Sequence, residues 1–191
     1  MRIGISFPGK IPRAFWLMVV VLFFADLWTK AWAWDFAAHG PVEVVDGWLA
    51  IQKVTNPGGI FGLGQGLRIP LTLLRSAAVV FLFLLAGRQD ETCRLGVPTL
   101  GLLTAGAMGN LWDNLSSWAP WAGNGEVRDF IRIDLGPGPE FWPGFLPWPF
   151  HPWPLFNLAD SCISIGFLLL ITGLARIRLQ APDGGKDLPR P

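Results

Sequence analysis

The side chains best suited to chemistry are carboxylates that adjoin strongly apolar segments. The stretch FNLADSCISIG (156–166) places Asp160 just before a run, from Cys162 to Ala175, that carries no charge. Asn157 and Asp160 have the spacing of a helix N-cap and its third residue, so capping alone accounts for Asp160 locally. A carboxylate here can also act as a general acid or base if a second carboxylate shares its proton. The local pattern leaves both roles open.

Two further polar pairs lie in otherwise apolar segments. Asp26 and Lys30, in DLWTK, are four residues apart and share a helix face. They predict either an ion pair that fixes helix packing or the lining of a substrate path. Asn110 and Asp113, in GAMGNLWDN (106–114), are three apart and close an apolar run. Capping and interhelical hydrogen bonding are the structural roles open to them.

Two stretches between the apolar runs are less informative alone. The glycine-rich TNPGGIFGLGQG (55–66) permits a tight turn, and the absence of a following Lys-Ser/Thr pair argues against a phosphate loop. In GEVRDF, Asp129 follows Arg128, and neighbours in a strand point to opposite faces, so Arg128 need not neutralise it. With only His39 and His151 as histidines, we expect neither a metal site nor a Ser-His triad.

Composition restricts the class of protein. The 191 residues are 51% hydrophobic and 15% charged, whereas about a quarter of the residues in a soluble domain are charged. A net charge of +1 offers no basic surface for nucleic acid. The 11 tryptophans suit the interfaces of a bilayer. We therefore predict an integral membrane protein, in which Cys93 and Cys162 form neither a disulfide framework nor a zinc site.

The apolar runs predict a mainly α, polytopic membrane protein with four transmembrane helices in one domain, 1–191. Nine of the fifteen Lys and Arg residues lie in the N-terminal segment, the 87–94 loop and the tail after Ala175, which predicts that both termini are cytoplasmic. Arg68 and Arg75 are expected to snorkel at the outer end of the second span. The predicted spans are 15–36, 70–86, 95–112 and 158–175, with outer segments 37–67 and 113–157 and a cytoplasmic tail 176–191.

The outer segments predict a small extracytoplasmic β-sheet. VEVVDGWLAIQKV (42–54) and VRDFIRIDL (127–135) alternate apolar and polar residues, as strands do. We expect them to pair on the membrane surface. The stretch 136–154 contains seven prolines, which disfavour helix and inner strand. We predict an irregular interfacial loop there.

Taken together and in order, DLWTK, NPGGIFG, GAMGNLWDN, GEVRDFI and FNLAD resemble the signal peptidase II family, the lipoprotein signal peptidases of bacteria. The resemblance extends from about Phe15 to Ala175. It implies an aspartic endopeptidase of the cytoplasmic (inner) membrane that needs no cofactor or metal. The implied substrates are diacylglyceryl-modified prolipoproteins, cut just before the lipidated cysteine. Membrane lipid is the other implied partner, with no nucleic acid and no obligate protein partner.

The resemblance also assigns residues. The family's catalytic pair falls on Asp129 and Asp160, one acting on the attacking water and the other on the scissile carbonyl. The implied binding and supporting residues are Asn56, Gly58, Asn110, Asp113, Asn157, Asp26, Lys30 and Arg128.

The sequence departs from the family pattern at three places. Asn114 stands where the family usually has arginine, so Arg75, Arg128 or Arg132 is expected to supply that cation. Ile60 replaces a small residue in the glycine-rich loop. The connection between Asp129 and Asp160 is longer than is typical, and we expect it to cover the site as a lid or interfacial apron.

Two other functions fit parts of the pattern. A small proton-coupled transporter would use Asp26 and Asp160 as relay groups, but polar residues would then be spread through the depth of the membrane. A non-catalytic scaffold, including an inactive homologue of the peptidase, would fit the departure at Asn114.

Overall fold

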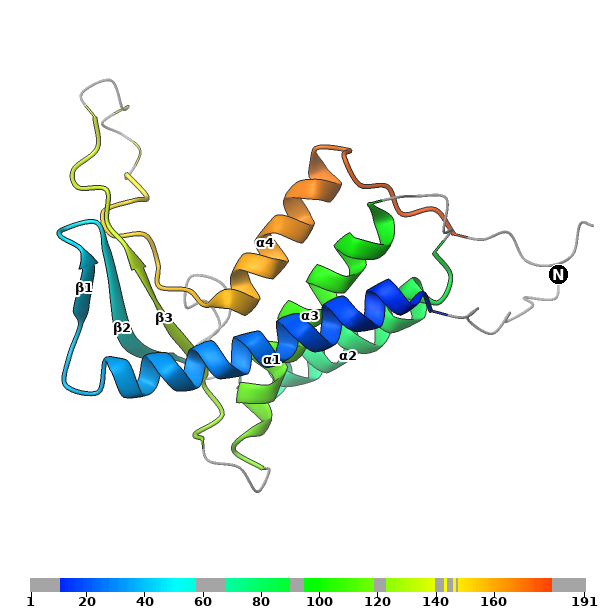
Figure 1. Ribbon diagram of the computed structural model, residues 1–191, viewed down its shortest axis with the longest axis horizontal. Helices are drawn as coiled ribbons and strands as arrows, with labels where there is room; N and C mark the ends of the chain where they lie inside the picture. Colours follow the sequence, from blue (N-terminus) through cyan, green and yellow to red (C-terminus); the bar gives the residue numbers. More distant parts are fainter. Residues whose placement is uncertain are drawn as a thin grey trace, which may run out of the picture.

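The chain folds into four helices with a three-stranded sheet at one end of them (Figure 1). The computed structural model describes residues 11–57, 68–89, 95–118, 123–139, 143, 146 and 148–179. The elements are α1 (Arg13–Phe36), β1 (Val42–Val45), β2 (Leu49–Asn56), α2 (Arg68–Ala86), α3 (Gly96–Leu115), β3 (Val127–Ile133) and α4 (Leu158–Ile171).

Helix α3 is the centre of the helical part and packs against α1, α2 and α4. Small residues allow the close approach: a Cβ atom on Gly106 would lie 2.7 Å from the Ile163 side chain of α4, and one on Gly101 would lie 2.9 Å from Met18 of α1. Helix contacts through small residues are common in membranes, where the lipid offers no hydrophobic driving force for association. Gly106 therefore allows α3 and α4 to pack closely.

Helices α1 and α2 are, among the described helices, the two that are long and apolar enough to cross a membrane. The prediction of four such spans is supported for these two only. Helix α4 ends at Ile171, after 14 residues, where the chain turns toward Gly173 with a φ of 71°. Helix α3 has 20 residues but carries Asn110, Asp113 and Asn114 in its last turns.

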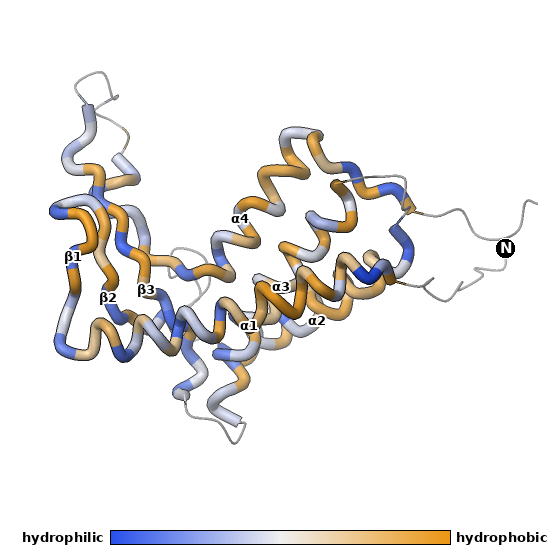
Figure 2. Tube along the Cα trace, in the orientation of Figure 1, coloured by the Kyte–Doolittle hydropathy of each residue, from blue (hydrophilic) through white to orange (hydrophobic). Residues whose placement is uncertain are grey.

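The outer faces of these helices are nevertheless apolar. Hydrophobic residues run along α1, α2 and α4 (Figure 2), and large ones such as Phe24, Leu73 and Ile171 are mostly exposed. Exposed apolar area of this extent is unfavourable in water and suits contact with lipid.

The sheet has the order β1-β2-β3 and is antiparallel throughout. The expected pairing of the two outer segments is confirmed, since Val54 of β2 lies opposite Asp129 of β3. The single strand predicted over 42–54 is wrong: β1 and β2 form a hairpin that turns at Asp46 and Gly47, where Gly47 has a φ of 71°. An Asp-Gly pair favours such a turn because glycine adopts positive φ without strain.

The end of α1 supports the sheet from below in Figure 1. Ala33 and Ala37 form a buried cluster with Ile51 of β2 and Phe130 of β3. The far edge of β3 is covered by the chain that returns toward α4, because the Phe156 carbonyl accepts hydrogen bonds from the backbone N–H groups of Phe130 and Ile131. The strand that carries Asp129 is therefore held on both edges.

Candidate active site

Asp160 lies in the first turn of α4, where it caps the helix. The Asn157 side-chain oxygen accepts from the Asp160 backbone N–H at 2.9 Å, and Asp160 Oδ2 accepts from the Asn157 N–H at 3.1 Å. The predicted capping role is thus confirmed. Asp160 Oδ1 accepts from the Asn110 side-chain amide of α3 at 2.8 Å. Capping through Oδ2 therefore orients Asp160 and leaves Oδ1 facing the Asn110 amide.

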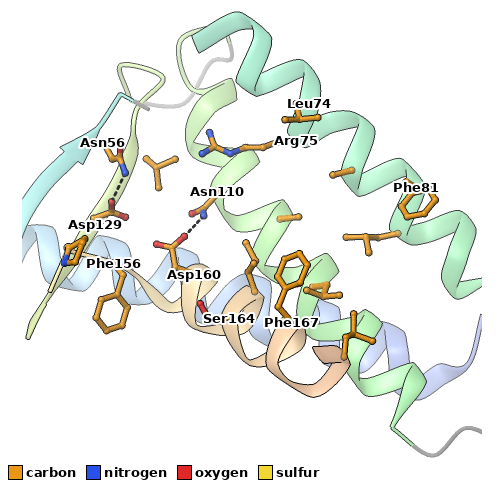
Figure 3. A pocket seen from close by; sticks show the side chains of 18 of the residues that line it. Asn56, Leu74, Arg75, Phe81, Asn110, Asp129, Phe156, Asp160, Ser164 and Phe167 are labelled. Carbon is orange, nitrogen blue, oxygen red and sulfur yellow. Dashed lines mark hydrogen bonds between the residues drawn. The ribbon is translucent and has the colours of Figure 1, made fainter. Parts of the chain in front are cut away.

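Asp129 reaches the same place from β3 (Figure 3). Its carboxylate is buried and accepts from the side-chain amides of Asn56, at 3.1 Å, and Asn157, at 2.7 Å. Val54 of β2 is the cross-strand partner of Asp129. Asn56 lies two residues after Val54 and therefore on the same face of the strand, so its side chain can reach Asp129. Burial, and next the nearby charge of Asp160, raise the pKa of Asp129 to about 7.

Asn157 links the two carboxylates. Its side-chain nitrogen lies 2.7 Å from Asp129 Oδ1 and 3.2 Å from both the Arg128 carbonyl and Asn110 Oδ1, while its oxygen caps α4. The residue is completely buried. Because one side chain contacts β3, α3 and α4, its position fixes Asp129 relative to Asp160.

A buried ion cluster lies behind Asn110. Lys30 Nζ is 2.7 Å from Asp26 Oδ2, 3.1 Å from Asp113 Oδ2 and 3.1 Å from Asn110 Oδ1. Asp26 Oδ1 accepts from the Ala159 backbone N–H at 2.9 Å, which joins α1 to the start of α4. Neither Asp26 nor Lys30 lines the cavity described below. Of their two predicted roles, the geometry supports packing rather than a substrate path.

Arg128 completes this cluster and points away from Asp129. Its guanidinium donates to Asp113 Oδ1 from Nε at 3.0 Å and from Nη2 at 2.7 Å, and its backbone N–H donates to Asp113 Oδ2. Both guanidinium bonds end on one oxygen of Asp113 and the backbone N–H binds the other, so three hydrogen bonds fix the carboxylate. Asp113 and Arg128 therefore hold β3 against α3, and the expectation that Arg128 does not neutralise Asp129 agrees with this arrangement.

A cavity of about 660 Å³ opens beside the two aspartates, between α2, α3 and α4. Its polar end is formed by Asn56, Arg75, Asn110, Asp129 and Asp160. Beyond this end the lining is almost entirely apolar and includes Phe81, Leu85, Leu103, Phe167 and Ile177.

The expected snorkelling of Arg75 is wrong. Its side chain turns into the cavity (Figure 3), where it donates a hydrogen bond to Asn114 Oδ1. Asn114 in turn donates to the Gly125 carbonyl at 2.9 Å, just before β3. Of the three arginines expected to compensate for Asn114, Arg75 is thus the one in contact with it, whereas Arg128 binds Asp113 and Arg132 binds Glu43.

The sequence did not single out the aromatic residues at the mouth of the cavity. Trp153 and Phe156 line it, and Trp153 stacks on Phe150 with ring centroids 4.9 Å apart. Trp153 belongs to the proline- and tryptophan-rich segment, and Phe156 is the first residue of FNLAD itself. The predicted support residue Gly58, and Ile60, lie outside the described residues.

Asn157→Ala is expected to lower both stability and any activity that depends on the two carboxylates. Loss of the cap should cost about 1 kcal/mol of unfolding free energy, and Asp129 also loses its 2.7 Å donor. Thermal unfolding and activity would be measured together. Asn157→Ser separates the effects, because serine can cap the helix but is too short to reach Asp129. A serine variant with unchanged activity would contradict the linking role.

The profile of the signal peptidase (SPase) II family matches residues 18–176. The lipoprotein signal peptidase of Porphyromonas gingivalis is 32% identical over 210 residues, which cover 95% of this chain and 90% of that protein. The lipoprotein signal peptidase of Aquifex aeolicus is 36% identical over 172 residues, covering 87% of this chain and 88% of that protein.

Solved structures show the same fold. Two chains described as bacterial membrane enzymes, obtained by the in meso method, superpose with TM-scores of 0.68 and 0.65. Both are 24% identical to this chain and cover 88% of it, while the matches span 92% and 97% of their own lengths.

Proposed function

This chain belongs to the signal peptidase II family, and we propose that it is a membrane-embedded aspartic endopeptidase that removes signal peptides from diacylglyceryl-modified prolipoproteins. The observation that carries the aspartic mechanism is the placement of Asp129 and Asp160 at the polar end of an apolar cavity, linked through Asn157. A lipid-modified peptide needs both a water-supplied polar site and an apolar space beside it.

In the proposed mechanism the two carboxylates share one proton. Burial raises the pKa of Asp129, which favours placing the shared proton there. Asp160 then takes a proton from the attacking water, while Asp129 donates its proton to the scissile carbonyl oxygen. The tetrahedral diol collapses when Asp160 gives its proton to the amide nitrogen and Asp129 takes a proton from one diol hydroxyl, which breaks the C–N bond and restores the starting protonation. The products are the signal peptide carboxylate and the free amine of the lipidated cysteine.

We also propose that the polar end of the cavity faces outward in the cytoplasmic membrane, with both termini on the cytoplasmic side. The excess of Lys and Arg in the predicted cytoplasmic segments supports this orientation. The exposed apolar faces of α1, α2 and α4 would then contact lipid. Substrate would reach the aspartates sideways from the bilayer.

The geometry does not favour a proton-coupled transporter. A relay from Asp26 to Asp160 would need Asp26 to face a path, but Asp26 is 1% exposed and is held by Lys30 and the Ala159 backbone. A non-catalytic scaffold is separated from the peptidase by direct assay.

The test is cleavage by the purified protein in lipid. A prolipoprotein peptide carrying diacylglyceryl cysteine should be cut just before that cysteine, as measured by mass spectrometry of both products. The same peptide without the lipid is the control and should be cut far more slowly. Equal cleavage of both peptides would refute the proposed substrate class, and no cleavage of either would refute the activity.

The cleavage rate is expected to fall as the pH rises above about 7. The pKa of Asp129 is raised to about 7, so the shared proton is lost above that pH, and the rate should drop about tenfold per pH unit. Initial rates across the neutral range would be measured. Asp134→Asn is the control, because Asp134 pairs with His151, which lowers its pKa. A rate that rises through neutral pH would contradict a shared proton.

A further inference from the structure

The cavity lining changes from polar to apolar along α2. Arg75 lines the polar end together with Asp129 and Asp160, and the same face of α2 continues with Ala78, Phe81 and apolar residues one turn further on. These positions recur at spacings of three and four, so they form one side of the helix. Figure 3 shows Arg75 near Asn110 at the polar end, with Phe81 further along the same helix.

Arg75 is held in a defined orientation at this boundary. Its Nη1 donates to Asn114 Oδ1, and the buried Asn114 is fixed in turn by the Gly125 carbonyl. A guanidinium presents five N–H donors in a planar fork, so it can bind Asn114 and a further oxygen acceptor together. Among the described residues that line the cavity, Arg75 is the one cation.

The order of groups in a diacylglyceryl-modified peptide matches the order along the cavity. From the scissile amide, the substrate continues through the cysteine thioether and glyceryl group to ester carbonyls, and then to acyl chains. We infer that Arg75 binds an ester carbonyl of the diacylglyceryl group and so directs its acyl chain into the apolar part of the cavity; this inference rests on the proposed function.

Charge favours a neutral acceptor over an anionic one. Asp129 and Asp160 line the same end of the cavity as Arg75, and at least one of them is ionised when they share a proton. A phosphate or carboxylate placed on Arg75 would be repelled by that charge. An ester carbonyl accepts a hydrogen bond from the guanidinium without adding negative charge.

The experiment compares two substrates that differ only in this acceptor. One peptide carries the natural diacylglyceryl group, and the other carries the dialkyl ether analogue, in which each ester carbonyl is replaced by a methylene. For the wild-type protein the ether analogue should raise KM about tenfold or more, the loss expected when a charged hydrogen bond is removed. Its kcat should change little.

Arg75→Met should abolish this difference, so that both substrates show the raised KM of the ether analogue with the wild type. Arg75→Lys should keep part of it. Arg68→Met is the matched control: Arg68 lies on the same helix, donates to the Asn124 carbonyl and does not line the cavity, so the preference for ester should be unchanged.

Three results would overturn the inference. The first is equal processing of the two substrates by the wild type. The second is a preference for ester that persists in Arg75→Met. The third is an Arg75→Met variant whose kcat falls by the same factor for both substrates while KM is unchanged, which would place Arg75 on the carboxylate pair instead. If the wild type cut neither substrate, the proposed function itself would fail, and that result is distinct from all three.

Discussion

Asp129→Asn and Asp160→Asn are each expected to reduce kcat about a thousandfold or more. Each carboxylate has its own proton transfer in the proposed mechanism, and a positioned acid or base contributes roughly 10²–10⁴-fold. Asparagine keeps the size of the side chain and one oxygen acceptor but cannot exchange a proton. Single-turnover cleavage of the lipidated peptide, under conditions of saturating enzyme, would measure the chemical step.

The control for this pair is Glu126→Gln, which makes the same change of carboxylate to amide three residues before Asp129. Glu126 is only partly buried and accepts from Asn124, so its variant should cleave at the wild-type rate. Because burial disfavours the ionised form of Asp129, Asp129→Asn should unfold at the same temperature as the wild type or higher. Full activity in either aspartate variant would remove that residue from the catalytic pair.

Lys30→Met is expected to destabilise the protein by about 3–5 kcal/mol, the usual cost when one partner of a buried ion pair is removed. Lys30 is completely buried, and its ammonium lies within 3.1 Å of both Asp26 and Asp113. Methionine fills a similar volume but leaves Asp26 with no cation beside it. Asp113 retains Arg128. Unfolding of the purified protein in one fixed detergent would be followed by thermal melting.

Lys53→Met is the control, since Lys53 is exposed on β2 and lies over the ring of Trp34. Its unfolding temperature should stay close to that of the wild type. The double variant Asp26→Asn/Lys30→Met should recover part of the lost stability. It removes the unpaired negative charge of Asp26 and keeps a side-chain oxygen that accepts from the Ala159 N–H. If Lys30→Met were as stable as Lys53→Met, the cluster would contribute little.

The parts of the site that depend on local sequence were predictable. The Asn157–Asp160 capping box has a three-residue spacing, and the antiparallel pairing of β2 with β3 follows from two alternating segments. The link from Asn157 to Asp129 spans 28 residues. No local pattern specifies this link, because it depends on how the chain returns along β3. The resemblance to a known family paired Asp129 with Asp160 and named Asn157 only as a supporting residue.

The errors also have physical causes. The apolar alternation of 42–54 runs across the turn between β1 and β2 and so predicts one strand, although Asp46-Gly47 is a recognised turn signal. The direction of Arg75 could not be predicted, because composition shows that a helix is apolar but not which side faces its neighbour. The span over 95–112 stays a prediction: the polar residues in the last turns of α3 make contacts inside the protein.

The hydrogen bond between Arg75 and Asn114 has an evolutionary consequence. The two residues come from different helices and act as one unit, with a cation from α2 meeting an amide on α3. A relative with arginine at position 114 supplies the cation from α3 and would crowd a second one at position 75. We therefore expect these two positions to covary across the family, arginine at one accompanying an uncharged residue at the other.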